Sequence, residues 1–309
     1  MAQPALSTTD PASERLPRQG FFLLASLALF WGTNWPAMKL AVQDMDPWTF
    51  RAICFVAGAG GLMLVARARG LSLRIPRGDL GPLILTAFIN VTCWQVFSAF
   101  GLTLMAAGRA SIIAFTMPVW AALLAIPLLG ERPGGRQVVG LALGLGGLLV
   151  LLGPEALRGG AGDLSGPFLV VAAAVSWALG TVLMKRRGIW RSHAAVVTGW
   201  QYALSAVPVI VLAAVLESAP GPASWHLPTW LALGYHLVFS ICIAQILWFV
   251  IVRRLTMAQS TIATLLIPVV GVAGSILVLG DPLSARVLAA LALVVSAVAC
   301  VMVRRRRSD

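Results

Sequence analysis

Ten long apolar stretches run through the chain and are separated by short polar segments. Each stretch has about 18 to 24 residues, and an α-helix needs roughly 17 to 25 residues to cross a bilayer. The pattern predicts an all-α, polytopic membrane protein with ten transmembrane helices. The expected spans are 21–42, 48–66, 81–104, 108–129, 136–153, 166–186, 194–216, 229–252, 258–279 and 285–303.

The composition agrees with this pattern. Hydrophobic residues make up 59% of the 309 residues and charged residues only 11%, with a mean hydropathy of +0.89, whereas a soluble domain carries roughly a quarter charged residues. Residues 1–19 are polar and rich in Pro, Ser and Thr, which predicts a disordered N-terminal tail. Residues 304–309 form a basic C-terminal tail. The first span lacks an A-x-A cleavage signal, so we expect it to be retained rather than removed as a signal peptide.

The basic residues predict the orientation in the membrane. With the N-terminus inside, 18 of the 23 Lys and Arg residues fall on the cytoplasmic side, as the positive-inside rule requires. We therefore expect both termini in the cytoplasm and a location in the inner membrane of a bacterium. The net charge of +12 does not indicate nucleic-acid binding, because the basic residues lie in short clusters between apolar spans. The outer side keeps Lys39, Arg51, Arg109, Arg158 and Arg286.

The second half of the chain repeats the first. A shift of 150 residues aligns "AFTMPVWAALLAIPLLGERPGGR" (114–136) with "TLLIPVVGVAGSILVLGDPLSAR" (264–286). A shift of 146 aligns "LFWGTNWPAMK" (29–39) with "VSWALGTVLMK" (175–185). The aligned pairs include Pro118 with Pro268, Glu131 with Asp281, Gln95 with Gln245, Trp31 with Trp177, and Lys39 with Lys185.

Each repeat, 20–153 and 166–303, holds five of the expected spans. Because five is odd, the two copies must cross the membrane in opposite directions. Inverted repeats of this kind are typical of secondary transporters, in which the substrate site lies near the midplane between the halves. The sequence therefore predicts two inverted five-helix repeats around a central site.

These motifs carry a resemblance to a known family. Residues 31–39 and "GRASIIAFTMPVWAALLAIPLLGE" (108–131), with their counterparts 177–185 and "AQSTIATLLIPVVGVAGSILVLGD" (258–281), resemble the drug/metabolite transporter superfamily, in its ten-span branch of two EamA-type domains. The resemblance covers about residues 20–303. It implies a ten-helix bundle with a central cavity, often exporting amino acids or related metabolites. The Trp-rich first span is further similar to that of aromatic amino acid exporters.

The first span holds polar groups that hydrocarbon tolerates poorly. A polar group at membrane depth is tolerated where it faces the bundle interior or a cavity, so we expect Trp31 and Asn34 to line the site. Pro36 removes a backbone hydrogen bond and can kink this helix. Lys39, near the outer surface, either snorkels to the interface or joins the site. Trp35 belongs either to the interfacial aromatic belt or to the cavity.

Other candidates come from the repeat. Gln95 and Gln245 either face the cargo or bond a neighbouring helix, and His236 is either a bonded core residue or a proton relay. Gly140 and Gly144 have the G-x3-G spacing of close helix packing, and Pro118 and Pro268 are expected to kink or pack helices. The full expected substrate-binding set is Trp31, Asn34, Lys39, Trp94, Gln95, Trp177, Gln245 and Trp248.

The missing chemistry narrows the function. All eleven acidic residues lie in tails, loops or span ends, whereas a transporter of cations normally uses a buried carboxylate. This favours neutral or zwitterionic cargo, and uniport over proton exchange. Three scattered His and four isolated Cys suggest neither catalytic set nor metal site, so we expect no enzyme, cofactor or metal.

The interpretation is a secondary transporter that exports small neutral or zwitterionic metabolites, most simply amino acids, by alternating access. We expect a monomer whose partners are its small-molecule substrate and the lipid bilayer. A nucleotide-sugar carrier is the alternative, and it should show several basic residues in mid-span. A membrane-embedded enzyme is a more remote alternative. A channel would call for a ring of like groups.

Overall fold

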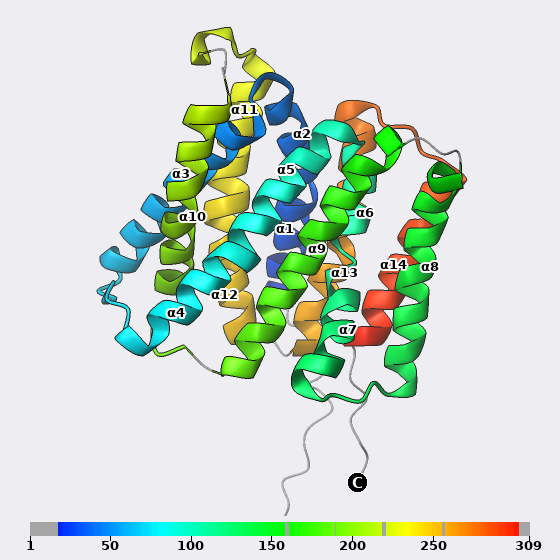
Figure 1. Cartoon of the computed structure of the whole chain (residues 1–309), viewed down its shortest axis with the longest axis horizontal. Helices are drawn as coiled ribbons and strands as arrows, with labels where there is room; N and C mark the ends of the chain where they lie inside the picture. Colours follow the sequence, from blue (N-terminus) through cyan, green and yellow to red (C-terminus); the bar gives the residue numbers. More distant parts are fainter. Residues whose placement is uncertain (1–17, 158–160, 189, 218–220, 255–256, 303–309) are drawn as a thin grey trace, which may run out of the picture.

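The computed structural model describes residues 18–157, 161–188, 190–217, 221–254 and 257–302, and the described residues are helical apart from short connections. The helices stand side by side in one bundle (Figure 1). Eight continuous helical stretches of the described chain are long and apolar enough to cross a membrane, and two shorter apolar helices, Thr264–Leu279 and Ala285–Val301, occupy the places of the ninth and tenth spans. The chain is thus the all-α membrane protein that its pattern predicts.

The first half contains the first five spans, two of which are broken. Span one is interrupted at Thr33, where the hydroxyl of Thr33 donates back to the carbonyl of Leu29 at 2.6 Å. Span four is interrupted at Phe115 and Thr116, and Pro118 lies in the first turn of the helix that follows. The elements are α1 (Arg18–Gly32), α2 (Asn34–Asp44), α3 (Pro47–Ala68), α4 (Arg77–Thr86), the π-helix η2 (Ala87–Cys93), α5 (Trp94–Leu104), α6 (Ala107–Ala114), α7 (Met117–Leu129) and α8 (Gly135–Leu157).

The second half has the same order of elements, with fewer breaks. Pro268 lies inside a helix that continues through it, so the ninth span does not break as the fourth does. The elements are α9 (Ala161–Arg187), α10 (Ala194–Leu216), the short 3-10 turn η3 (Pro222–Ser224), α11 (Leu227–Tyr235), the π-helix η4 (His236–Ile243), α12 (Ala244–Arg254), α13 (Met257–Leu279) and α14 (Ala285–Met302).

Local backbone features recur at the shift of 150 residues. The π-helix η2 in span three has its counterpart in η4 in span eight. Gly130 and Gly280, which end α7 and α13, adopt left-handed conformations with φ of 68° and 69°. A left-handed residue after a helix favours glycine because it has no Cβ. The two halves therefore share local geometry as well as sequence. The start of α1 and the end of α14 point to the same side of the bundle (Figure 1).

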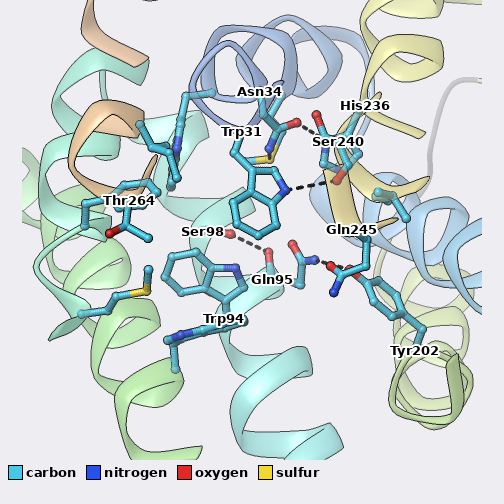
Figure 2. Close-up of a pocket in the computed structure, with 17 residues that line it drawn as sticks. Trp31, Asn34, Trp94, Gln95, Ser98, Tyr202, His236, Ser240, Gln245 and Thr264 are labelled. Atoms are coloured by element: carbon cyan, nitrogen blue, oxygen red, sulfur yellow. Dashed lines mark hydrogen bonds between the residues drawn. The ribbon is translucent and has the colours of Figure 1, made fainter. Parts of the chain in front are cut away.

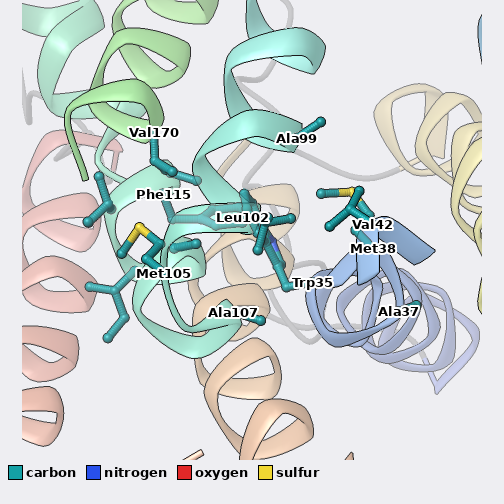
Figure 3. Close-up of a cluster of buried hydrophobic side chains, with 14 of the residues drawn as sticks. Trp35, Ala37, Met38, Val42, Ala99, Leu102, Met105, Ala107, Phe115 and Val170 are labelled. Atoms are coloured by element: carbon teal, nitrogen blue, oxygen red, sulfur yellow. The ribbon is translucent and has the colours of Figure 1, made fainter. Parts of the chain in front are cut away.

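Buried apolar side chains from both halves join in one core. Figure 3 shows Trp35, Leu102, Phe115 and Val170 meeting where α2, α5, the α6–α7 break and α9 converge. Glycines allow several of these approaches: a Cβ built on Gly101 would lie 2.5 Å from Val170 Cγ2. This packing holds the helices around the cavity described below.

The G-x3-G glycines of the fifth span lie at helix contacts. A Cβ on Gly140 would lie 2.7 Å from Val301 Cγ2 on α14, and one on Gly144 would lie 2.5 Å from Val119 Cγ2 on α7. Contacts under 3.0 Å are not found for real Cβ atoms, so a larger residue at either position would push these helices apart.

Candidate functional site

A cavity inside the bundle is lined by residues of both repeats (Figure 2). Its volume is about 160 Å³. This is room for roughly five to ten waters and therefore for one small metabolite. Seventeen residues line it, from spans one, three and four of the first half and spans six to nine of the second. The cavity thus lies where inverted repeats are expected to place a substrate site.

Two tryptophan pairs lie at the cavity, and three of their four members line it. The indole N–H of Trp31 on α1 donates to the carbonyl of Ser240 on η4 at 3.3 Å, and the Trp31 ring lies 5.8 Å from that of Trp248. In the second pair, Trp177 on α9 lies 5.4 Å from Trp94 on α5, so each pair joins the two halves. The first pair joins span one to span eight, and the second joins span six to span three. These are equivalent pairings, because the repeat relates span one to span six and span three to span eight.

The break at Thr33 places Asn34 at the start of α2, where its amide faces η4 (Figure 2). The Asn34 Oδ1 atom lies 2.5 Å from Nδ1 of His236, and its Nδ2 atom donates to the sulfur of Met38 at 3.2 Å. His236 is buried, is hydrogen-bonded through Nδ1 and lines the cavity. The pair links the two repeats at the cavity wall.

The two repeat-related glutamines both line the cavity, but their partners differ. Gln95 donates to the hydroxyl of Tyr202 at 3.4 Å, which connects α5 to α10. Gln245 makes no side-chain hydrogen bond with any residue that the structure describes (Figure 2). An amide at a cavity surface that has no partner among the described residues is available to bond a cargo molecule.

The structure brings together most of the predicted binding residues. Six of the eight line the cavity: Trp31, Asn34, Trp94, Gln95, Trp177 and Gln245. Trp248 lies one layer behind Trp31 and is not among the lining residues. Lys39 is also outside the lining, because its Nζ atom donates to the carbonyl of Leu102 at 2.5 Å.

The sequence left the surroundings of two buried residues open. Trp35 is 4% exposed and lines the cavity, so it does not belong to an interfacial belt. Arg51, which the count of basic residues places on the outer side of the membrane, is fully buried within the bundle. Its Nη2 atom donates to Ser98 Oγ at 3.1 Å and lies 3.6 Å from Met38 Sδ, and both partners line the cavity.

Several other lining residues carried no distinguishing signal in the sequence. Tyr202, Ser98, Ser240 and Thr264 each lie within an apolar run and reach the cavity only through the packing of their helices. The tyrosine and the small hydroxyl residues could have been found by asking which polar side chains of each span share a face with Trp31, Gln95 or Gln245.

No Asp or Glu is among the cavity-lining residues. The described carboxylates near the helix ends serve local contacts instead. Asp79 pairs with Arg187, and Glu217 accepts the backbone N–H groups of Trp48 and Thr49, each at 2.8 Å. The described part of the chain also contains no group of three side chains suited to hold a metal ion.

Two lysine–acid combinations are related by the repeat. Lys185, at the end of span six, pairs with Glu131 just beyond span four. The corresponding residues on the opposite side of the bundle are Lys39 and Asp281. These two described residues form no ion pair, and Lys39 donates to the carbonyl of Leu102. The Asp281 carboxylate instead accepts from the hydroxyl of Ser275 and from the backbone of Gly108.

Comparison with known proteins gives consistent matches along nearly the whole chain. A family model described as "EamA-like transporter family" matches residues 18–153 and again 164–303. The "Uncharacterized transporter YvbV" of Bacillus subtilis is 32% identical over 280 residues, which cover 90% of each chain. The "Probable amino-acid metabolite efflux pump" of Escherichia coli is 25% identical over 276 residues, covering 87% of this chain and 90% of the relative.

A solved structure described as "Crystal structure of protein" has the same fold. It matches with a TM-score of 0.65 at 24% identity and covers 91% of this chain and 96% of its own. At this identity the match establishes the fold alone.

Proposed function

The chain belongs to the EamA-like transporter family, and on that premise we propose that it exports small neutral or zwitterionic metabolites, with amino acids as the cargo. Aromatic amino acids are the favoured members of this class. The observation that carries the proposal is the central cavity, which combines indole faces with amide groups and has no acidic side chain among its lining residues.

The shape of this lining suits an aromatic or large apolar side chain. Trp31, Trp94 and Trp177 supply flat apolar faces, and aromatic pairs gain about 0.5–1.5 kcal/mol beyond the burial of their area. The amides of Gln95 and Gln245 can bond the polar end of the same molecule. A polyamine or cationic drug would find no carboxylate in the lining, and burying an unpaired charge is costly.

The curated relatives support an amino-acid cargo. The matching proteins of Escherichia coli and Salmonella typhimurium are each named a "Probable amino-acid metabolite efflux pump". A nucleotide-sugar carrier is less well supported, because none of the cavity-lining residues is Lys or Arg and the cavity volume is small for a nucleotide sugar in this conformation.

The unequal lysine–acid combinations support alternating access. Inverted symmetry makes Lys185 with Glu131 on one side equivalent to Lys39 with Asp281 on the other. One ion pair is formed and its counterpart is not, which is the arrangement expected if the two sides open in turn. The Lys185 and Glu131 side chains are 62% and 44% exposed, so the pair contributes at most about 1 kcal/mol and biases the equilibrium rather than locking it.

The same lining supports uniport as the transport mode. A proton-coupled exporter normally carries its proton on a carboxylate at membrane depth, and no Asp or Glu is among the lining residues. The cargo's own gradient is then the driving force. We further propose that one chain is sufficient, because each chain contains both repeats, and that it acts in the inner membrane with both termini in the cytoplasm.

Substrate competition in proteoliposomes tests the cargo class. Counterflow of labelled phenylalanine is measured against an excess of a neutral amino acid, lysine, spermidine or UDP-glucose. We expect strong competition by neutral amino acids, with the aromatic ones strongest, and little by spermidine or UDP-glucose. Competition by UDP-glucose alone would favour the nucleotide-sugar alternative, and no counterflow of any amino acid would refute the cargo class.

A further inference from the structure

Arg51 is a buried cation without an acidic partner among the residues that the structure describes. It is the fifth residue of α3 and has no exposed surface. Its guanidinium carbon lies 4.8 Å from the centre of the Phe50 ring. The Nε and Nη1 atoms are buried and have no hydrogen-bond partner. Burying a charge that is neither paired nor fully hydrogen-bonded is costly, so the residue needs an explanation beyond packing.

The unsatisfied groups are concentrated at one point. The described part of the chain has five buried side-chain polar atoms without a partner, and three of them belong to Arg51 and His236. The third is Nε2 of His236, whose ring lies 5.1 Å from that of Phe50. More than nine in ten buried polar groups in proteins are hydrogen-bonded. Three exceptions around a single phenylalanine indicate a binding position for a ligand.

This point adjoins the central cavity. Met38 and Ser98 line the cavity, and both contact the Nη2 atom of Arg51 from the other side. The guanidinium therefore lies directly behind the cavity wall. The contact with Met38 Sδ is weak because a thioether is a poor acceptor, and a methionine side chain adapts easily to a new neighbour. A small movement of Met38 would open Arg51 to the cavity.

No described acid forms an ion pair with Arg51, Asp46 at the N-terminus of the same helix included, and two other carboxylates are engaged elsewhere. Glu217, which follows α10, packs against the start of α3. Its carboxylate accepts from the backbone N–H groups of Trp48 and Thr49 and from the Thr49 hydroxyl, each at 2.8 Å. Asp44 accepts from the backbone of His226 at 2.9 Å and from the hydroxyl of Thr229 at 2.5 Å. Neither acid pairs with Arg51, so the positive charge remains available to a ligand.

We propose that Arg51 is the anion-binding residue of the cavity and that the cargo presents a carboxylate to it. The proposal rests on the proposed amino-acid transport and adds the group that recognises one end of the cargo. A guanidinium binds carboxylates through fixed, parallel N–H donors. The carboxylate replaces the weak sulfur contact, while the indole faces of the cavity hold the side chain.

Binding of matched analogues tests the proposal without requiring transport. The probes are phenylalanine, phenylalaninamide, which lacks the carboxylate, and 3-phenylpropanoate, which lacks the ammonium group. Each is titrated into the purified full-length protein in nanodiscs, with quenching of the cavity tryptophans as the signal. We expect phenylalanine and 3-phenylpropanoate to bind and the amide to bind roughly 10- to 100-fold more weakly, as for loss of a charge-assisted hydrogen bond.

Substitution of the arginine separates recognition from structure. In Arg51→Met we expect the preference for carboxylate over amide to vanish while the thermal midpoint stays equal or rises, because an uncompensated buried charge has been removed. Arg51→Lys should keep part of the preference, which covers the case that the Met variant does not fold. Arg67 is exposed in the last turn of the same helix. Arg67→Met is therefore the matched control, and it should bind the three probes as the wild type does.

The outcomes distinguish this proposal from the proposed function. Equal binding of phenylalanine and its amide to the wild type overturns the role of Arg51, and so does an unchanged preference in a folded Arg51→Met variant, even if amino acids are transported. Binding of 3-phenylpropanoate without any transport of amino acids supports Arg51 and refutes the amino-acid cargo. Acetate, lactate and succinate are added to the panel as smaller carboxylates. If neither phenylalanine, 3-phenylpropanoate nor any of these three binds, the inference is overturned.

Discussion

Gln245 offers the sharpest test of which residues contact cargo. Its amide lines the cavity and has no side-chain hydrogen bond to the described residues. Gln245→Leu keeps the approximate volume and removes only the amide, so the protein loses no internal bond. A cargo molecule that bonds this amide once or twice loses about 1–2 kcal/mol, which is roughly a 5- to 30-fold loss of affinity.

Gln201→Leu is the matched control. Gln201 on α10 is 5% exposed and is not among the cavity-lining residues. Its amide donates to the hydroxyl of Thr86 at 2.9 Å. Interhelical bonds of this kind contribute about 0.6 kcal/mol and at most about 1.7 kcal/mol, so this variant should melt earlier and keep the affinity for cargo.

The assay measures two quantities on each purified variant: the concentration dependence of phenylalanine counterflow in proteoliposomes, and the thermal midpoint. We expect Gln245→Leu to change the first and Gln201→Leu the second. If Gln245→Leu is folded and has the wild-type affinity, the amide does not contact the cargo. If both variants change both quantities together, the effect is structural and the assignment of Gln245 to the site is wrong.

Three further predictions concern the cavity, the two sides of the bundle and the orientation. Trp31→Ala should reduce the affinity for phenylalanine roughly 5- to 30-fold through the loss of an aromatic contact of about 1–2 kcal/mol. Arg305→Ala in the basic tail is the control and should change counterflow little. If Trp31→Ala is folded and has the wild-type affinity, Trp31 is not part of the site. Glu131→Gln, which breaks the ion pair with Lys185, should shift the balance between the two open states by up to about fivefold. Asp281→Asn should not shift it in the same direction. The balance is measured by labelling single cysteines on each side with an impermeant thiol reagent in a cysteine-free background, and identical labelling of Glu131→Gln and wild type would contradict the prediction. An alkaline phosphatase fused after Asp309 should be inactive in cells, because 18 basic residues favour a cytoplasmic C-terminus; strong activity would reverse the topology.

Much of the fold was predictable because span length and repeat alignment depend only on local sequence. The apolar runs located the helices, and the shift of 150 residues correctly paired positions whose backbones agree, such as the helix-ending Gly130 and Gly280. The aligned prolines did not behave alike: Pro118 follows a break, while α13 continues through Pro268. A proline removes one backbone bond in either case, and whether the helix breaks depends on packing that the sequence does not display.

The site was predictable where a residue type is conspicuous in an apolar span. Trp31, Asn34 and Gln245 stood out for that reason and do line the cavity. Arg51 did not, because a basic residue three positions into a span can point toward either the outer surface or the interior. Only the packing of Met38 and Ser98 against its guanidinium decides the matter. Lys39 shows the reverse case, since the carbonyl of Leu102 holds it away from the lining. The orientation in the membrane and the monomeric state stay predictions.

Counterflow with every ion gradient abolished is the most direct test of a uniporter for amino acids. Proteoliposomes are loaded with unlabelled phenylalanine, diluted into labelled phenylalanine at the same pH and salt composition, and treated with a protonophore. The account predicts transient accumulation of label in the wild type, with little accumulation in Gln245→Leu at low substrate concentration. Accumulation that requires a proton gradient would contradict uniport, and its absence for every amino acid under either condition would contradict the cargo.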